Sequence, residues 1–349
     1  MNLLKKPLVT RGWDKDILAK YELGDVPLVM GNMTNQCNYN CIYCHTDAGK
    51  KDENELNADE WIRILDESKE LGNEVFWIGG KGEPILDNAF RKVIRHADDI
   101  GLTTVLNTNG SLITKKRAKL LYNNNVSPEV KIISFDEDVY DYLSGTIGNL
   151  PALRKGLNNL IKAGYRKIVD ETDDARITRM SGMLLMAKPA YQSMPDVFRY
   201  CDRNNFAPVV SDVVASGRVV KRGNLDELKL SDEEKKNIWE LGSEIMSYPL
   251  NKGIEECQIQ YGIVVQNNGD LIIDTYGMSC DVCDYYGRRV AGNLREISLK
   301  EGWEIIKEER KRNETARKIA YDQFKEECSA CLASCPMAHK SQKDYYGLN

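Results

Sequence analysis

The sequence is poor in histidine and has no long apolar runs. Only three histidines occur in 349 residues, and no serine–histidine–aspartate set or glutamate pair stands out, so conventional acid–base catalysis finds little support. No stretch approaches the roughly 20 apolar residues that span a bilayer, and residues 1–14 contain no signal-peptide core. We therefore expect a cytoplasmic protein with no membrane partner.

Concentrated positive charge is also missing. The formal net charge is -5, and this disfavours a nucleic-acid partner because phosphate binding needs a concentrated basic surface. The composition, with 42% hydrophobic and 29% charged residues, is that of a globular protein without disorder. A chain of this length is expected to form one large domain with a smaller appendage.

Short β-rich runs alternate with helical patterns between residues 28 and 213, which predicts an α/β fold with a parallel sheet. Six such units would form a partial (β/α)6 barrel of the TIM type, whose chemistry lies at the carboxyl ends of the strands. The predicted strands are 28–33, 75–79, 103–107, 130–135, 182–187 and 207–213, and the predicted helices are 57–71, 88–99, 114–124, 150–163 and 195–204.

The remaining residues predict a second, smaller unit. A helix over 231–247 is followed by a connector, a β-hairpin around Asn267–Asp270 and a charged helix from Ser298 to about residue 320. We expect an N-terminal extension at 1–27, the barrel at 28–249 and a cysteine-rich domain at 250–349.

Nine of the ten cysteines are clustered, which in a reducing compartment indicates metal or thiol chemistry rather than disulfides. Cys37, Cys41 and Cys44 are separated by three and then two residues. So short a loop can bind three corners of a cubane cluster and leave the fourth iron without a protein ligand. Zinc held by the three cysteines and His45 is the alternative.

With Tyr43 before its last cysteine, this loop resembles the motif of the radical S-adenosylmethionine (SAM) superfamily. The stretch 79–84, Gly-Gly-Lys-Gly-Glu-Pro, is similar to the family's glycine-rich motif that binds the amino group of SAM. Most members have Gly-Gly-Glu-Pro, so Lys81 is an insertion or a variant spacing. Glycines allow a backbone to approach a small zwitterion closely, and Glu83 offers an acceptor to its ammonium group.

The same resemblance implies further SAM contacts. Polar residues at the next strand ends would bind the ribose and carboxylate of SAM, and Tyr43 would lie near the adenine. Each of these side chains could equally be a satisfied polar group at a strand end, and the glycines could form ordinary turns. The cofactor-binding residues implied by the resemblance are Tyr43, Gly80, Gly82, Glu83, Asn107, Thr108, Asn109 and Ser134.

The resemblance also implies a reaction. A 4Fe-4S cluster cleaves SAM reductively, and the resulting 5'-deoxyadenosyl radical abstracts hydrogen from an unactivated carbon. The electron would come from a low-potential donor such as flavodoxin or ferredoxin. The protein's tasks are to position the target carbon and to exclude water.

A second group of cysteines lies near the carboxyl terminus and contains two pairs with metal-knuckle spacing. On spacing alone a structural zinc ribbon is an alternative. In context the segment resembles the SPASM or twitch extensions of radical SAM enzymes, which predicts at least one auxiliary 4Fe-4S cluster. Asp274 stands where a further cysteine is usual, so it is a candidate ligand. The predicted metal-binding cysteines here are Cys257, Cys280, Cys283, Cys328, Cys331 and Cys335.

These features predict a radical SAM oxidoreductase or epimerase that acts on a small molecule, such as a sugar or an aminocyclitol. A leftover cysteine could donate a hydrogen atom in an epimerisation, although Cys201 fits a helix core better. One alternative is a maturase of a ribosomally made peptide, which is disfavoured because residues 1–27 leave no room for a leader-binding domain. The other is a non-catalytic iron–sulfur or zinc scaffold.

Overall fold

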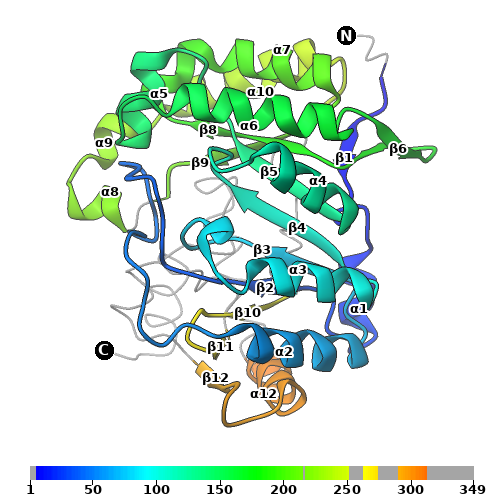
Figure 1. The fold of residues 1–349 in the computed structure, drawn as a ribbon. Coiled ribbons are helices and arrows are strands. Elements are labelled where there is room, and N and C mark those ends of the chain that lie inside the picture. Colours follow the sequence, from blue (N-terminus) through cyan, green and yellow to red (C-terminus); the bar gives the residue numbers. More distant parts are fainter. Residues whose placement is uncertain (1–4, 215–216, 251–261, 274–289, 313–349) are drawn as a thin grey trace.

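The computed structural model describes residues 5–214, 217–250, 262–273 and 290–312, which form an α/β fold (Figure 1). The helices are α1 (Ile17–Glu22), α2 (Ala58–Glu70), α3 (Phe90–Asp99), α4 (Lys115–Asn123), α5 (Glu137–Ser144), α6 (Leu150–Ala163), α7 (Met194–Asn204), α8 (Arg218–Lys221), α9 (Leu225–Leu228), α10 (Asp232–Met246) and α12 (Leu299–Arg312), with 3-10 turns η1 (Pro84–Leu86) and η2 (Lys188–Ser193). The strands are β1 (Leu8–Thr10), β2 (Val29–Gly31), β3 (Val75–Ile78), β4 (Thr103–Thr108), β5 (Val126–Lys131), β6 (Ile168–Glu171), β7 (Arg176–Thr178), β8 (Ser181–Met186), β9 (Ala207–Asp212), β10 (Ile263–Val265), β11 (Asp270–Ile272) and β12 (Val290–Asn293).

The larger sheet has nine strands in the order β12-β11-β10-β2-β3-β4-β5-β8-β9. All neighbours from β10 to β9 are parallel, whereas β11 pairs antiparallel with both β10 and β12. The predicted α/β fold with a parallel sheet is therefore confirmed. Because these strands run in one direction, the loops that follow β2, β3 and β4 all leave the same edge of the sheet.

Alternate strand residues face opposite sides of the sheet, as the period of two requires. Val29 and Phe76 belong to the larger core cluster, which the covering helices complete. Their neighbours Met30 and Trp77 lie in a separate, smaller cluster on the other face. This alternation explains why both faces of the strands are apolar, as expected for a parallel sheet that is covered on both sides.

Helix α2 begins where the sequence indicates. The Asn57 side chain accepts hydrogen bonds from the first turn, and the Glu60 side chain accepts one from the backbone of Asn57, which completes the predicted capping box. Trp61 and Ile64 on the same helix are fully buried. Local capping and apolar periodicity therefore agree at this helix.

The fourth predicted strand is displaced. It was expected at 130–135, but β5 spans Val126–Lys131, so residues 132–135 belong to the loop after the strand. Pro128 and Glu129 lie inside β5, and both are depleted in strands, which hides its amino-terminal half from propensity arguments. The loop then leads into α5, a short helix with no counterpart among the predicted elements.

A second sheet has the order β1-β7-β6, in which β7 pairs parallel with β1 and antiparallel with β6. Its strands have only three or four residues, too few for a periodic pattern. The predicted extension at 1–27 therefore contains both β1 and α1.

The predicted hairpin near Asn267 is present as β10 and β11, and β10 hydrogen-bonds with β2 of the main sheet.

Helix α12 contacts the rest of the fold through Trp303, which is 1% exposed and donates its indole N–H to the carbonyl of Gly24 at 3.0 Å. The domain division near residue 250 stays a prediction. Among the described residues, no helix has the length and apolar character needed to cross a bilayer.

Helix α6 lies against the turn that follows β4. A Cβ atom added to Gly156 would collide with the carbonyl oxygen of Gly110, so only glycine allows this close approach. Because Gly110 follows Thr108 and Asn109, the contact also fixes a part of the chain that the sequence assigns to the site.

We predict that Gly156→Ala lowers the free energy of unfolding by about 1–3 kcal/mol, because the added methyl group overpacks this contact. Helix propensity alone would give the opposite sign, favouring alanine by about 1 kcal/mol. Urea denaturation measures the difference. The exposed neighbour Lys155 provides the control, since Lys155→Ala should change stability by no more than about 0.5 kcal/mol. A Gly156→Ala variant as stable as the parent protein would contradict the prediction.

Candidate functional site

Three free cysteines lie on one closed loop at the carboxyl end of β2. Cys37, Cys41 and Cys44 are each partly buried. The base of the loop is closed by backbone hydrogen bonds, in which the Cys37 N–H donates to Gly49 and the Gly49 N–H donates to Asn35, both at 2.9 Å. The structure therefore brings together the three cysteines that the sequence singles out.

The thiols need a cation if they are to ionise. Burial, together with the charge of Cys44, raises the pKa of Cys37 to about 11 and that of Cys41 to about 12. Thiolates are the form that binds metal, and a bound cation would compensate their mutual repulsion. The donor set of three thiols therefore fits an iron–sulfur cluster, which cysteine thiolates ordinarily hold.

A single metal ion fits the loop less well. Within the described parts of the chain, no three His, Cys, Asp or Glu side chains are grouped closely enough to hold one ion. His45 is partly buried, and its removal from solvent lowers its pKa to about 4. In a cubane cluster each cysteine binds a different iron, so the thiolates lie further apart than around one ion.

The glycine-rich loop after β3 packs against the cysteine loop. Gly80 and Gly82 have φ values of 83° and 66°, in the left-handed region that favours glycine. A Cβ atom on Gly82 would collide with the carbonyl oxygen of Thr34, and the Glu83 N–H donates to the carbonyl of Gln36 at 2.8 Å. The two loops therefore share a backbone contact directly before Cys37.

Glu83 joins the ends of β3 and β4. Its side chain accepts hydrogen bonds from the Thr108 hydroxyl at 2.7 Å and from the Asn109 N–H at 2.8 Å. Glu83 is only 1% exposed, and burial raises its pKa to about 7 although both hydrogen bonds oppose the rise. The carboxyl group therefore changes charge close to neutral pH.

The remaining predicted contacts divide into two groups. Asn109 donates its side-chain N–H to Asn38 at 2.9 Å, which links the end of β4 to the cysteine loop. Asn107 lies so close to the glycine-rich loop that a Cβ on Gly79 would be 2.8 Å from its amide nitrogen. Ser134, by contrast, accepts a hydrogen bond from the Asp136 N–H at 2.9 Å and thus supports the start of α5.

Lys131 is a charged residue of this region that the sequence pattern does not reveal. It ends β5, and its ammonium group lies 5.7 Å from the centroid of the Tyr43 ring. Burial lowers the pKa of Lys131, and the neighbouring charges of Cys41 and Cys44 oppose that effect. A basic residue that ends a strand is too common to be a signal by itself.

Arg218 was also missed, although it contacts the cysteine loop directly. Its guanidinium donates to the carbonyl of Cys41 at 3.0 Å and to that of Ala48 at 2.5 Å, and its backbone N–H donates to Cys44 at 2.8 Å. Figure 1 shows α8 beside the loop that follows β2. The only sequence signal is a Gly–Arg pair after the last predicted strand.

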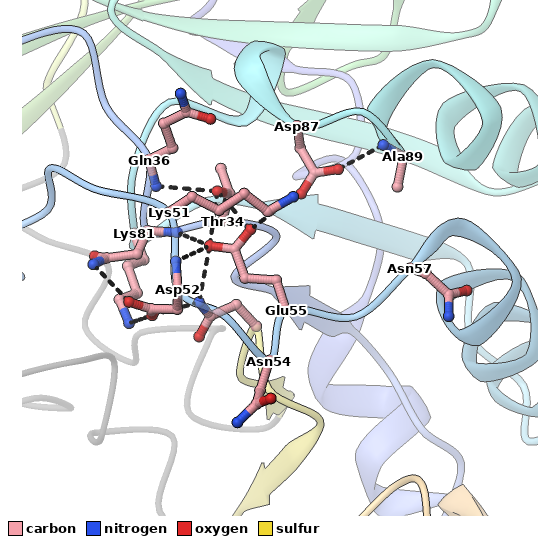
Figure 2. A network of polar contacts seen from close by, with 12 residues as sticks. Thr34, Gln36, Lys51, Asp52, Asn54, Glu55, Asn57, Lys81, Asp87 and Ala89 are labelled. Carbon is pink, nitrogen blue, oxygen red and sulfur yellow. Dashed lines mark hydrogen bonds and ion pairs between the residues drawn. The ribbon is translucent and has the colours of Figure 1, made fainter.

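A buried carboxylate supports the cysteine loop. It belongs to Glu55, whose side chain is 1% exposed. It accepts hydrogen bonds from the Thr34 hydroxyl at 2.9 Å and from the backbone N–H groups of Asn35 and Asp52 at 2.8 and 3.1 Å (Figure 2). These donors come from both ends of the cysteine loop. Glu55 therefore holds the two stems of the loop together.

Lys81, the residue that departs from the usual glycine-rich motif, has a specific partner. Its ammonium group pairs with the carboxylate of Asp52 (Figure 2), with 2.9 Å between the two atoms, and Asn267 donates to the same carboxylate oxygen at 2.8 Å. Although burial opposes the change, the hydrogen bonds from Asn267 and Lys81 lower the pKa of Asp52. The glycine-rich loop is thus tied to the β10–β11 turn.

Comparison with known proteins identifies this part of the chain. Residues 32–173 match the family model of the radical SAM superfamily. These residues form a radical SAM domain. The match includes the cysteine loop, the glycine-rich loop and the ends of β4 and β5, and the cofactors of the radical SAM domain are a 4Fe-4S cluster and SAM.

Curated relatives match over the same region. Fe-coproporphyrin III synthase of Methanosarcina barkeri is 29% identical over 159 residues, which are 44% of this chain and 40% of the relative. Mycofactocin maturase MftC of Mycolicibacterium smegmatis is 27% identical over 172 residues, which are 45% of this chain and 43% of the relative. This chain thus spans less than half the length of either relative.

Solved structures share the fold over a longer stretch. Streptococcus suis SuiB bound to SAM has a TM-score of 0.61 at 16% identity, covering 79% of this chain and 65% of SuiB. The protein anSMEcpe with bound SAM has a TM-score of 0.55 at 16% identity, covering 92% of both chains. At these identities the likeness establishes the radical SAM fold alone.

Several predicted ligands lie outside the described residues. They are Cys257, Asp274, Cys280, Cys283, Cys328, Cys331 and Cys335. The auxiliary cluster therefore stays a prediction. Cys201 is described, is fully buried in α7 and packs near Gly182, as expected for a core residue.

We predict that Thr108→Val lowers the free energy of unfolding by about 1–3 kcal/mol, because it leaves the buried carboxyl of Glu83 without its hydroxyl donor. Thr104 on the same strand is the matched control. Its buried hydroxyl has no hydrogen-bond partner among the described residues, so Thr104→Val should be neutral or stabilising. Denaturant titration of both variants gives the comparison, and equal losses would contradict the assigned role of the Thr108 hydroxyl.

Proposed function

We propose that Cys37, Cys41 and Cys44 are the protein ligands of the radical SAM cluster in this chain. The observation that carries the proposal is the closed loop with three partly buried thiols beside the carboxyl group of Glu83. When bound, the reduced cluster supplies the electron that converts SAM to methionine and a 5'-deoxyadenosyl radical, which abstracts hydrogen from an unactivated carbon.

The charged groups around the loop suit the two ends of the methionyl group of SAM. Glu83, with the backbone of Gly80 and Gly82, would bind its ammonium group. Lys131 would provide the positive charge for the carboxylate of SAM. Among the described residues, the ammonium group of Lys131 has no ion pair and no hydrogen bond, and a partly buried charge needs such a partner. The further contacts that we propose for SAM come from Tyr43, Asn107, Thr108, Asn109 and Ser134.

We propose a small molecule as the substrate, with oxidation or epimerisation of a sugar or aminocyclitol as the reaction. A low-potential donor such as flavodoxin or ferredoxin would supply the electron. The cysteines after residue 250 would hold at least one auxiliary 4Fe-4S cluster. Iron analysis separates the cases, because about four irons per chain correspond to the triad cluster alone and about eight to one auxiliary cluster.

A peptide substrate is the second candidate. Two of the matched folds were solved with peptides bound, SuiB with its precursor peptide SuiA and anSMEcpe with the Cp18Cys peptide. These observations make a peptide the second candidate, and no described residue distinguishes it from a small molecule. Deuterium transferred from a labelled substrate to 5'-deoxyadenosine would decide between a sugar and a peptide.

The experiment that tests the proposed function measures SAM cleavage. Anaerobically reconstituted protein, reduced with dithionite in the presence of SAM, should form 5'-deoxyadenosine. Cys44→Ala should lower this rate by at least about 1,000-fold, because the cluster loses one of its three anchors.

Cys201→Ala is the control for that experiment, since Cys201 is buried in α7 and should not be a ligand. It should keep the parental iron content and the parental rate. Parental activity of Cys44→Ala, or absence of 5'-deoxyadenosine from the parent protein, would refute the proposed function.

The pKa of Glu83 predicts the pH dependence of SAM binding. Burial raises this pKa to about 7, and only the ionised carboxylate pairs with an ammonium group. Below pH 7 the ionised fraction falls up to about tenfold per pH unit, so the Kd for SAM should rise by the same factor. Isothermal titration calorimetry on the reconstituted protein between pH 5.5 and 8 measures it. Glu83→Gln should bind SAM more weakly and with little pH dependence, and a parental Kd constant over this range would contradict the assignment.

A further inference from the structure

The segment after β9 holds the cysteine loop from behind through one side chain. The two terminal NH2 groups of Arg218 donate hydrogen bonds to the carbonyls of Cys41 and Ala48. Its Nε lies 2.8 Å from the carboxylate of Asp47. The backbone N–H of Arg218 donates to the carbonyl of Cys44. One residue thus contacts the cysteine loop at four points that include two of the three cysteines.

A glycine makes this approach possible. Gly217 has a φ of 60°, and a Cβ atom there would collide with the backbone of His45. The chain therefore passes the cysteine loop at backbone contact distance immediately before Arg218. Only the planar guanidinium, with five donors in a fixed fork, can reach two carbonyls and a carboxylate at once, so lysine would not replace it.

Two cations, Arg218 and Lys221, pair with the carboxylate of Asp47. The Arg218 side chain is 10% exposed and the Lys221 side chain is 58% exposed. Because solvent screens an exposed charge far more than a buried one, Arg218 contributes more than Lys221 to the field at the cysteine loop.

We propose that Arg218 is a positioning residue for the iron–sulfur cluster and raises the reduction potential of that cluster. Its hydrogen bonds fix the backbone from Cys41 to Ala48, and its buried positive charge stabilises the reduced cluster, which carries one more negative charge than the oxidised one. This inference rests on the proposed function, because it takes Cys37, Cys41 and Cys44 as the ligands.

The test compares four forms of the full chain after anaerobic reconstitution: the parent, Arg218→Gln, Arg218→Lys and Lys221→Gln. An EPR-monitored redox titration gives the midpoint potential of the SAM-responsive cluster. Loss of iron to a chelator reports how firmly the loop holds the cluster. The parent protein must show the SAM-responsive signal, and its absence would count against the proposed function rather than against the role of Arg218.

We expect Arg218→Gln to shift the midpoint potential to more negative values and to lose iron about 10–100-fold faster. Lys221→Gln removes the same formal charge from an exposed position and should change both readouts much less. Arg218→Lys keeps the charge but not the fork, so its potential should stay near that of the parent while its iron loss is accelerated.

Two results would overturn the inference. One is an Arg218→Gln protein with the parental potential, and the other is a Lys221→Gln protein with an equal shift, which would indicate a general effect of surface charge. If Arg218→Gln fails to retain the cluster, Arg218→Lys decides, because parental iron retention in that variant would refute the positioning role.

Discussion

The path of the cysteine loop depends on the buried carboxylate of Glu55. A charge removed from water needs several donors, and here they come from Thr34 and Asn35 before the loop and from Asp52 after it. The two stems of the loop are therefore held at a fixed separation. The contacts of the glycine-rich loop with the carbonyls of residues 34 and 36 depend on that same backbone.

Much of the radical SAM fold could be predicted because its signals are local. The capping box of Asn57 and Glu60 marks the start of α2, and apolar runs mark the parallel strands. Strand ends then predict which loops converge, as the contact of Glu83 with Thr108 illustrates. The position of β5 was not predicted because it depends on distant residues. Glu129 in this strand can be buried because the indoles of Trp13 and Trp77 donate to it, and no local pattern reveals such partners.

The same reasoning explains why parts of the candidate site escaped prediction. Arg218 binds backbone carbonyls, which every residue possesses, so its partners leave no trace in the sequence. Lys81 was recognised as a departure from the family motif, but its partner Asp52 lies in a segment with no motif of its own. Asn267 completes that contact from the β10–β11 turn, which lies far along the chain from both Asp52 and Lys81.

The pairing of β2 with β10 affects how the chain acquires its fold. Residues 29–31 leave the ribosome long before residues 263–265, which form one of the two neighbours of β2. Until then, one edge of the strand that leads into the cysteine loop has unpaired backbone groups, which can pair with other chains. Such distant pairing also slows folding. A chain cut before residue 263 would therefore keep this edge open permanently.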